Sequence, residues 1–427
     1  MTPTKNAVLV LNAERSRRSN LTETLTAILS RIDPADPAGC LHAYAPWARE
    51  LNYVNQHITV PQDEINAATK AYAAVAHLLL KELDWPEDAI EVLPQGSAST
   101  QTLIRSPDSS KFDIDAVCQV DISRIDAQDP VGFFDTVGKA LDELSPKRKK
   151  RCWNIAYNGE RFYLEFTPSV PLKKVPQVIL DYMAPRFLPA MGYLDTALAV
   201  VDNPTRQWKT SNPAGFTKWM DDAAKLQLIR QPTTEIAFAR KAAASVAPVP
   251  DQEVEITDTL RVAVRLFKRH RDMCVRRNQL DKDFKPISII IVTLLTTCYS
   301  GLADLGRTCD HPVELLADLA QLIPGMVDQR DGEYRVENPT VQGENFAERW
   351  NEDDGERHEA FMTWCDILMA DMRAILAAQD EQDIRDVVRT VFGCVQDRST
   401  PVEPKNPSYM PPVRRPPPPV PRTAGLA

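Results

Sequence analysis

Residues 96–117 read GSASTQTLIRSPDSSKFDIDAV, and they carry the strongest structural signal in the chain. The stretch opens on Gly96 and Ser97 and ends on a strand-like run that contains Asp113 and Asp115. Side chains two residues apart on a strand point to the same face of a sheet, so we expect the two aspartates to project together. The residues expected to face the core are Phe112, Ile114 and Ala116.

This order of residue types indicates phosphate and metal chemistry. Two adjacent carboxylates repel each other unless a cation lies between them, and Mg2+ binds a few carboxylates together with substrate phosphates. A Gly-Ser turn at a helix start can bind a phosphate through its backbone N–H groups. Each feature alone has an ordinary interpretation, because an Asp-x-Asp strand is often a solvated sheet face and a Gly-Ser pair is often a plain turn. In this order, and with a third acid downstream, they indicate a nucleotide-transfer site.

The third acid is Glu165, in the run RFYLEFTP at residues 161–168. Its aromatic residues and closing proline predict a short strand. An Asn-Gly pair just before this run predicts a hairpin with a strand over residues 153–157. We expect the Glu165 strand to lie antiparallel beside the strand of the paired aspartates, which would bring three carboxylates together.

Together these residues resemble the DNA polymerase beta-like nucleotidyltransferases, through G-S-x(4)-T, D-x-D and a third acid on a strand that ends in proline. More narrowly, the chain resembles the cGAS/DncV-like enzymes (CD-NTases) of bacterial CBASS anti-phage systems, over roughly residues 50–395. Four further segments carry the narrower resemblance: Trp208–Phe216 with Trp219, Arg265–Asp272, Lys285–Ser288 and Asn338–Trp350. Two positions depart from the family pattern, because His270 stands where tryptophan is usual and Glu165 stands where aspartate is commoner.

The resemblance implies a metal centre of two Mg2+ ions, with Mn2+ as an alternative ion. Asp113 and Asp115 would hold both ions and Glu165 would bind the ion nearest the acceptor hydroxyl, which makes these three the candidate catalytic and metal-binding residues. The candidate nucleotide-binding residues are Gly96, Ser97, Lys268 and Ser288. Without the resemblance, the pattern around Lys268 indicates a basic helix with a solvated charged face, and His270 would be a packed or surface residue.

Composition limits the classes of partner. The chain has 427 residues and a formal net charge of −9, and its length is enough for one large core or two moderate ones. Because duplex nucleic acid is bound largely through phosphate neutralisation, we expect no stable duplex complex. The eight cysteines include no C-x-x-C pair, so we expect free thiols in a reducing cytoplasm and no zinc site. The start of the sequence does not resemble a signal peptide, and no apolar run is long enough for a bilayer, which predicts no membrane association.

These patterns predict an α+β protein with two lobes and a nucleotide cleft between them. Residues 1–220 are expected to form a nucleotidyltransferase domain that combines N-terminal helices with a mixed β-sheet. Residues 221–395 are expected to form a helical C-terminal domain, and residues 396–427 a disordered proline-rich tail. In the systems that the chain resembles, an operon-encoded regulatory or E1/E2-like partner can act on such an end. The alternative interpretation of the tail is a solubilising extension or a ligand for a proline-recognising domain.

The expected function is Mg2+-dependent nucleotidyl transfer from NTPs, ATP among them, with release of pyrophosphate. By resemblance, the product is a cyclic di- or trinucleotide second messenger in anti-phage defence. Two alternatives stay open: a linear oligonucleotide or tRNA nucleotidyltransferase that uses the same metal site, and a non-catalytic scaffold that retains the fold. The acidic charge argues against the first, and the presence of all three acids argues against the second.

Overall fold

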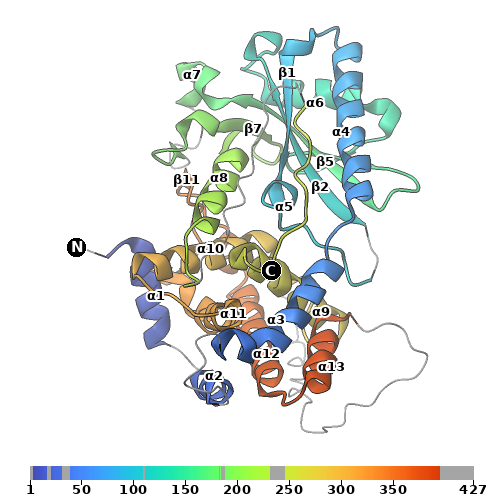
Figure 1. The fold of residues 1–427 in the computed structure, drawn as a ribbon. Coiled ribbons are helices and arrows are strands. Elements are labelled where there is room, and N and C mark those ends of the chain that lie inside the picture. Colours follow the sequence, from blue (N-terminus) through green and yellow to red (C-terminus); the bar gives the residue numbers. More distant parts are fainter. Residues whose placement is uncertain are drawn as a thin grey trace, which may run out of the picture.

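The computed structural model describes residues 3–16, 21–30, 39–108, 111–181, 183, 188–230 and 246–394. Figure 1 shows two lobes, one built on a mixed β-sheet and the other on helices. The predicted two-lobed α+β architecture is therefore confirmed. The predicted proline-rich tail over residues 396–427 lies outside the described residues.

Within the described residues, the larger sheet has seven strands, in the order β1-β2-β5-β4-β3, with β7 paired to β5 and β8 paired to β7. Their bounds are β1 Ile90–Gln95, β2 Phe112–Val120, β3 Lys147–Arg148, β4 Trp153–Ala156, β5 Phe162–Pro171, β7 Leu198–Asp202 and β8 Gln207–Ser211. β2 and β5 pair along most of their length, and they run parallel. The antiparallel arrangement that we expected for the Glu165 strand is therefore wrong.

The connection between β2 and β5 explains their parallel direction. Helix α6 (Pro130–Ala140) provides the crossover that a parallel return requires, and β3 then runs in the same direction as β2. Two reversals follow, because the β3–β4 and β4–β5 pairs are both antiparallel. The hairpin predicted from the Asn-Gly pair is confirmed, and β5 enters the sheet between β2 and β4.

Two helices cover one face of this sheet. α4 (Gln62–Glu82) and α6 share an apolar core with β2, β4 and β5, and Figure 1 shows α4 lying along the strands. Phe112, Ile114 and Ala116 point into this core and are buried, as predicted. The residues that alternate with them on β2 therefore lie on the opposite face.

The second lobe is helical. Its main helices are α8 Pro213–Ala224, α9 Thr259–Arg276, α10 Ser288–Asp304, α11 Pro312–Leu322, α12 Glu356–Ala377 and α13 Glu381–Phe392. The shorter elements of the whole fold are α5 Gly96–Ser99 and α7 Gln177–Leu180, both in the sheet lobe, the strand pair β6 Leu188–Pro189 with β11 Val341–Gln342, and the strand pair β9 Asp328–Arg330 with β10 Glu333–Arg335. None of the helices within the described ranges has both the length and the apolar content needed to span a membrane.

The first three helices belong to the core of the second lobe. They are α1 Lys5–Arg15, α2 Thr22–Leu29 and α3 Gly39–His57, and their buried residues join the cluster formed by α9–α13. The indole N–H of Trp47 donates to the backbone oxygen of Ile375 at 2.7 Å. This grouping differs from the predicted domain over residues 1–220. The physical reason is that α4 and α6 already cover the apolar face of the sheet, so α1–α3 bury their apolar sides against the other helices.

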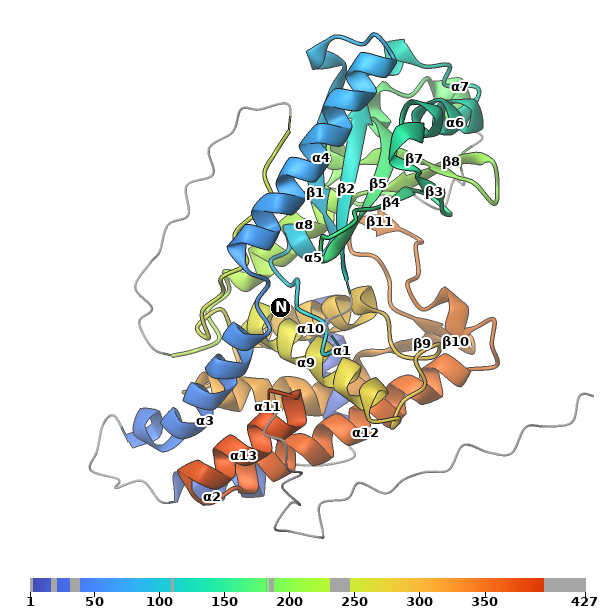
Figure 2. The ribbon, with the colours of Figure 1, turned by 90° about the vertical axis from the view of Figure 1, so that its right-hand side faces the viewer.

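Four cations of α9 are buried. Figure 2 shows α9 and α10 beneath α5 and the adjacent ends of the strands. Arg265, Lys268, Arg269 and Arg271 are all at most 5% exposed. The solvated charged face that the sequence predicts for this helix without the resemblance is therefore wrong. The segment that follows α5 makes few backbone ladder bonds, and its buried carbonyls need donors. α9 supplies them through the pairs Arg261–Thr100 (3.1 Å), Lys268–Thr102 (2.8 Å), Arg269–Arg105 (3.2 Å) and Arg276–Pro107 (2.6 Å).

His270 is a core histidine. Its ring is buried, and Nδ1 accepts the indole N–H of Trp364 at 3.0 Å. That leaves Nε2 as the donor to the carboxylate of Asp371, also at 3.0 Å. His270 therefore occupies the place of the family tryptophan as a packed and hydrogen-bonded side chain.

Arg269 should contribute strongly to stability. Its guanidinium donates to the backbone oxygens of Arg105, Phe392 and Gly393. In Arg269→Ala these buried carbonyls lose their donors, so we expect the free energy of unfolding to fall by about 3 kcal/mol. Chemical denaturation followed by circular dichroism measures this loss. The matched control is Arg276→Ala, because Arg276 is exposed and donates to one carbonyl; equal stability losses in the two variants would contradict the prediction.

Candidate active site

The structure places the three predicted acids on one face of the sheet. Asp115 on β2 lies directly opposite Glu165 on β5, and Asp113 lies one pleat along β2, opposite Tyr163. Residues directly opposite each other on neighbouring strands share a face. Asp113 is exposed at the end of β2, whereas Asp115 and Glu165 are half-buried. The register of β2 and β5 therefore places Asp115 and Glu165 side by side.

A polar row crosses the whole sheet at this level. Its members, from β1 to β3, are Gln95, Asp115, Glu165, Asn154 and Lys147. Because each is opposite the next, all five lie on the face away from α4 and α6. The acids are therefore bordered by an amide on each side, with a lysine at the sheet edge.

Asp113 and Glu165 raise the proton affinity of Asp115. The pKa of Asp115 lies well above its usual range, first because the carboxyl is buried and then because Asp113 and Glu165 repel its charge, while Lys268 opposes the shift. Burial and the same three carboxylates raise the pKa of Tyr163 to about 12. Such a concentration of negative charge favours a bound cation.

The donor set fits Mg2+ or Mn2+, because it consists of carboxylate oxygens beside a site where phosphates could bind. In the part of the chain that the structure describes, no three His, Cys, Asp or Glu side chains converge closely enough to form a ready-made metal site. Asp113, Asp115 and Glu165 are thus neighbours on the sheet without forming a closed set of ligands, and side-chain rotations would be needed to complete one.

The predicted Gly-Ser turn lies against these acids. Gly96 begins α5 with a φ of +64°, a conformation that favours glycine. A Cβ atom added to Gly96 would lie 2.2 Å from Oδ2 of Asp115. The backbone oxygen of Ser97 accepts the N–H of Thr102 at 2.9 Å, and the hydroxyl of Thr100 donates to the backbone oxygen of Gly96 at 3.1 Å. The turn and the acids therefore form one continuous surface.

Lys268 and Ser288 reach this region from the helical lobe. Burial, with Arg271 as a second cause, lowers the pKa of Lys268 to about 8, and the charge of Asp113 opposes the shift. Ser288 is the first residue of α10, and its hydroxyl accepts a hydrogen bond from Arg271 at 3.1 Å. Arg271 thus contacts Ser288 and acts on Lys268 through its charge.

Sequence reasoning missed several residues of the site. Asn154 was placed only on a predicted strand, Arg271 only on a basic helix, and Cys152 was treated as one of the scattered thiols. The structure places the Cys152 thiol 3.5 Å from Oε2 of Glu165. A correct β4–β5 register would have found Asn154, because Asn154 lies opposite Glu165.

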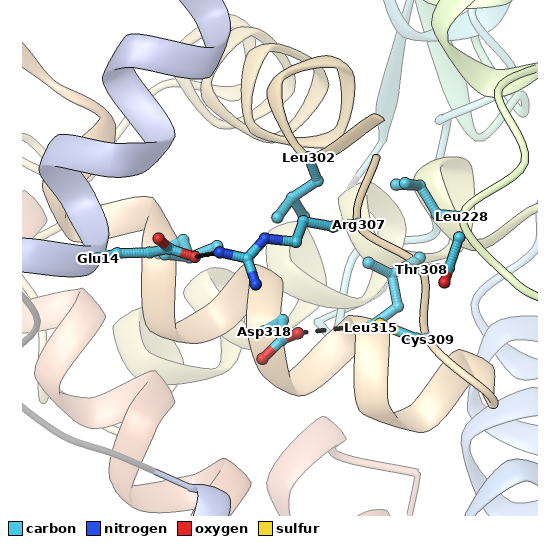
Figure 3. A pocket seen from close by; sticks show the side chains of 9 residues that line it. Glu14, Leu228, Leu302, Arg307, Thr308, Cys309, Leu315 and Asp318 are labelled. Carbon is cyan, nitrogen blue, oxygen red and sulfur yellow. Dashed lines mark hydrogen bonds and ion pairs between the residues drawn. The ribbon is translucent and has the colours of Figure 1, made fainter. Parts of the chain in front are cut away.

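The structure also has a small pocket in the helical lobe (Figure 3), which contains none of the predicted site residues. It is lined by Glu14, Leu228, Leu302, Arg307, Thr308, Cys309, Leu315, Asp318 and Leu322. Arg307 pairs with Glu14 at 3.4 Å, and the thiol of Cys309 donates to Asp318 at 3.8 Å. Each charged residue of the lining thus already has a partner within the pocket wall.

Solved structures of other proteins have a fold similar to that of this chain. No family model matches the chain. CdnG from Bradyrhizobium diazoefficiens, a CD-NTase solved in complex with GTP, has a TM-score of 0.55 and 19% identity, over 84% of this chain and 100% of that one. The cyclic AMP-GMP synthase DncV from Vibrio cholerae has a TM-score of 0.51 and 13% identity, over 81% of this chain and 95% of DncV. The chain has the CD-NTase fold.

Two further relatives bear on the CD-NTase comparison. A c-di-GMP synthase from Roseivirga ehrenbergii is 25% identical over 310 residues, which are 71% of this chain and 72% of the relative. The CD-NTase CdnC from E. coli, solved in complex with a HORMA protein, has a TM-score of 0.51 and 14% identity, over 81% of this chain and 96% of CdnC. The predicted resemblance to the CD-NTases and the assignment as a nucleotidyltransferase are confirmed. The roles of individual site residues stay predictions.

Proposed function

We propose that this chain is a divalent-metal-dependent nucleotidyltransferase that joins NTPs into a cyclic oligonucleotide and releases pyrophosphate. The observation that carries the proposal is the register of β2 and β5, which sets Asp115 opposite Glu165 with Asp113 one pleat away. The turn at Gly96 lies against the carboxylate of Asp115. A turn whose N–H groups would bind a phosphate, beside three acids that would hold metal ions, suits nucleotidyl transfer.

Asp113, Asp115 and Glu165 would hold Mg2+ or Mn2+. Such ions lower the pKa of an acceptor hydroxyl and neutralise charge on a leaving pyrophosphate. The backbone N–H groups at Gly96 and Ser97 would bind a phosphate of the donor NTP. Lys268 would contribute a point charge to the triphosphate, and Ser288 a hydroxyl.

The comparisons support particular substrates and a protein partner. The relative from Roseivirga ehrenbergii is named for a guanine cyclic dinucleotide, and CdnG was solved with GTP. We therefore propose GTP as a substrate beside the ATP expected from the sequence. A cytoplasmic role in anti-phage defence is proposed from the sequence resemblance alone. The CdnC–HORMA complex supports a regulatory protein partner for this chain, whose tail lies outside the described residues.

Product analysis tests the proposal. The purified protein is incubated with four labelled NTPs and Mg2+, treated with phosphatase, and its products are separated by chromatography. A phosphatase-resistant product supports cyclisation, and omission of single NTPs identifies its bases. Phosphatase-sensitive oligomers would indicate a linear polymerase instead. The absence of any product, together with the absence of triphosphate binding, would indicate a scaffold.

Binding of the triphosphate should depend on pH through Lys268. Its pKa of about 8 is far below the ordinary 10.5, so the free protein loses this charge as the pH rises above about 8. A bound triphosphate favours the charged form, and we expect the affinity for a non-hydrolysable ATP analogue to fall by up to about tenfold per pH unit above 8. Binding is measured by calorimetry between pH 7 and 9.5. Lys268→Ala should bind weakly with no such slope, and an unchanged slope in that variant would contradict the prediction.

A further inference from the structure

Cys152 lies just before β4, on the active-site face of the sheet. The β4–β5 register pairs Asn154 with Glu165 and Trp153 with Phe166. Cys152 precedes Asn154 by two residues and therefore shares its face, one diagonal step from Glu165. Its backbone oxygen accepts the N–H of Lys149 at 2.9 Å, so the position of the thiol is set by the turn between β3 and β4.

The thiol contacts the third acid. Sγ of Cys152 lies 3.5 Å from Oε2 of Glu165, with the thiol as donor. The side chain is 8% exposed, so little water competes for this contact.

Glutamate needs such a contact more than aspartate does. It has one more methylene group, and its terminal torsion is only weakly restricted, so an unsupported Glu165 carboxylate would sample many orientations. With Oε2 held by the thiol, the plane of the carboxylate is defined and Oε1 is available to a cation. Groups that orient metal ligands in this way commonly change metal affinity when they are removed.

We propose that Cys152 is a positioning residue that orients Glu165 toward the divalent cation. The proposal rests on the proposed function, because it assumes that Glu165 binds the metal. In this role the thiol compensates for the extra freedom of the glutamate side chain, which stands where aspartate is commoner. Cys152 acts through Glu165 and need not touch the nucleotide.

The test measures binding of Mn2+ alone, by electron paramagnetic resonance of the free ion, in the full chain. We expect Cys152→Ala to weaken Mn2+ affinity about tenfold and Cys152→Ser to restore most of it, because a hydroxyl also donates. In Glu165→Asp the carboxylate withdraws from the thiol, so adding Cys152→Ala to that variant should cause no further loss. Cys118→Ala is the matched control, since Cys118 is a buried thiol on the core face of β2 and its loss should leave Mn2+ affinity unchanged.

Other outcomes overturn the proposal in distinguishable ways. If Asp115→Ala abolishes Mn2+ binding but Cys152→Ala binds like the wild type, the metal site stands and the role of Cys152 is wrong. Additive losses in the double variant, or no restoration by serine in a variant that melts like the wild type, would also reject the positioning role. If the wild-type protein binds no Mn2+, the proposed function fails together with the inference.

Discussion

Replacing Asp115 with asparagine should reduce product formation by about 1,000-fold or more while it raises the melting temperature of the metal-free protein. The loss is expected because bound metal ions supply several kcal/mol of transition-state stabilisation, and each ~1.4 kcal/mol corresponds to a factor of ten in rate. Asp113→Asn should cause a similar loss of activity, since Asp113 is the other half of the pair on β2.

The gain in stability has a defined sign. Folding raises the pKa of Asp115, so the folded state binds this proton more tightly than the unfolded chain does. Wherever the carboxyl of the unfolded chain is charged, this difference lowers the stability of the metal-free protein, and the loss is relieved as the pH falls through the folded-state pKa. Asparagine removes the charge, and we expect the melting temperature to rise by roughly 2–4 °C.

Asp121 provides the matched control for both measurements. Asp121 directly follows the same strand. Its carboxylate accepts the N–H of Ser123 at 3.0 Å and pairs with Lys174 at 3.4 Å, so neither interaction involves another acid. Asp121→Asn should keep activity near the wild-type level. Loss of activity in Asp121→Asn comparable to that in Asp115→Asn would show that the β2 acids act through stability and not through a metal site.

Replacing Gly96 with alanine should abolish most activity in a protein that still folds. The added Cβ would lie 2.2 Å from Oδ2 of Asp115, which real structures do not tolerate. Either the carboxylate or the turn must therefore move, and a displacement of about 1 Å at a reacting centre can cost on the order of 100-fold in rate. Product formation and Mn2+ binding are measured together, and both should decrease.

The variant Gly159→Ala distinguishes a loss of activity caused by this contact from a loss caused by backbone strain. Gly159 lies in the β4–β5 hairpin with a φ of +83°, and an added Cβ would have no atom within 4 Å. Its substitution should cost only the left-handed conformation, about 1–2 kcal/mol of stability, and leave activity nearly intact. If both glycine variants lost activity equally, conformational strain alone would explain the effect at Gly96.

Local patterns in the sequence predicted the parts of the site that depend on one segment. The two-residue period placed Asp113 and Asp115 on one face and Ile114 in the core, because strand geometry alternates side chains whatever the sheet contains. The Asn-Gly pair predicted the β4–β5 hairpin because few residues adopt the required turn. These features need no knowledge of distant residues.

Features that depend on distant segments were predicted wrongly or missed. The parallel register of β2 and β5 depends on the crossover by α6, which no local pattern encodes. The burial of Lys268 and Arg269 depends on the carbonyls of Thr102 and Arg105, more than 160 positions away in the chain. A basic helix with such partners is buried, whereas the same helix without them would be solvated.

The sequence by itself therefore determined the chemistry: the three acids, the turn beside them and the strands that present them. Only the tertiary structure decided how these parts meet. It set Glu165 opposite Asp115, placed Gly96 against that carboxylate, and brought Cys152 within 3.5 Å of Glu165. The physical reason is that residue spacing fixes which side chains share a face of one element, whereas contacts between elements depend on the crossover, the register and the packing of the whole chain.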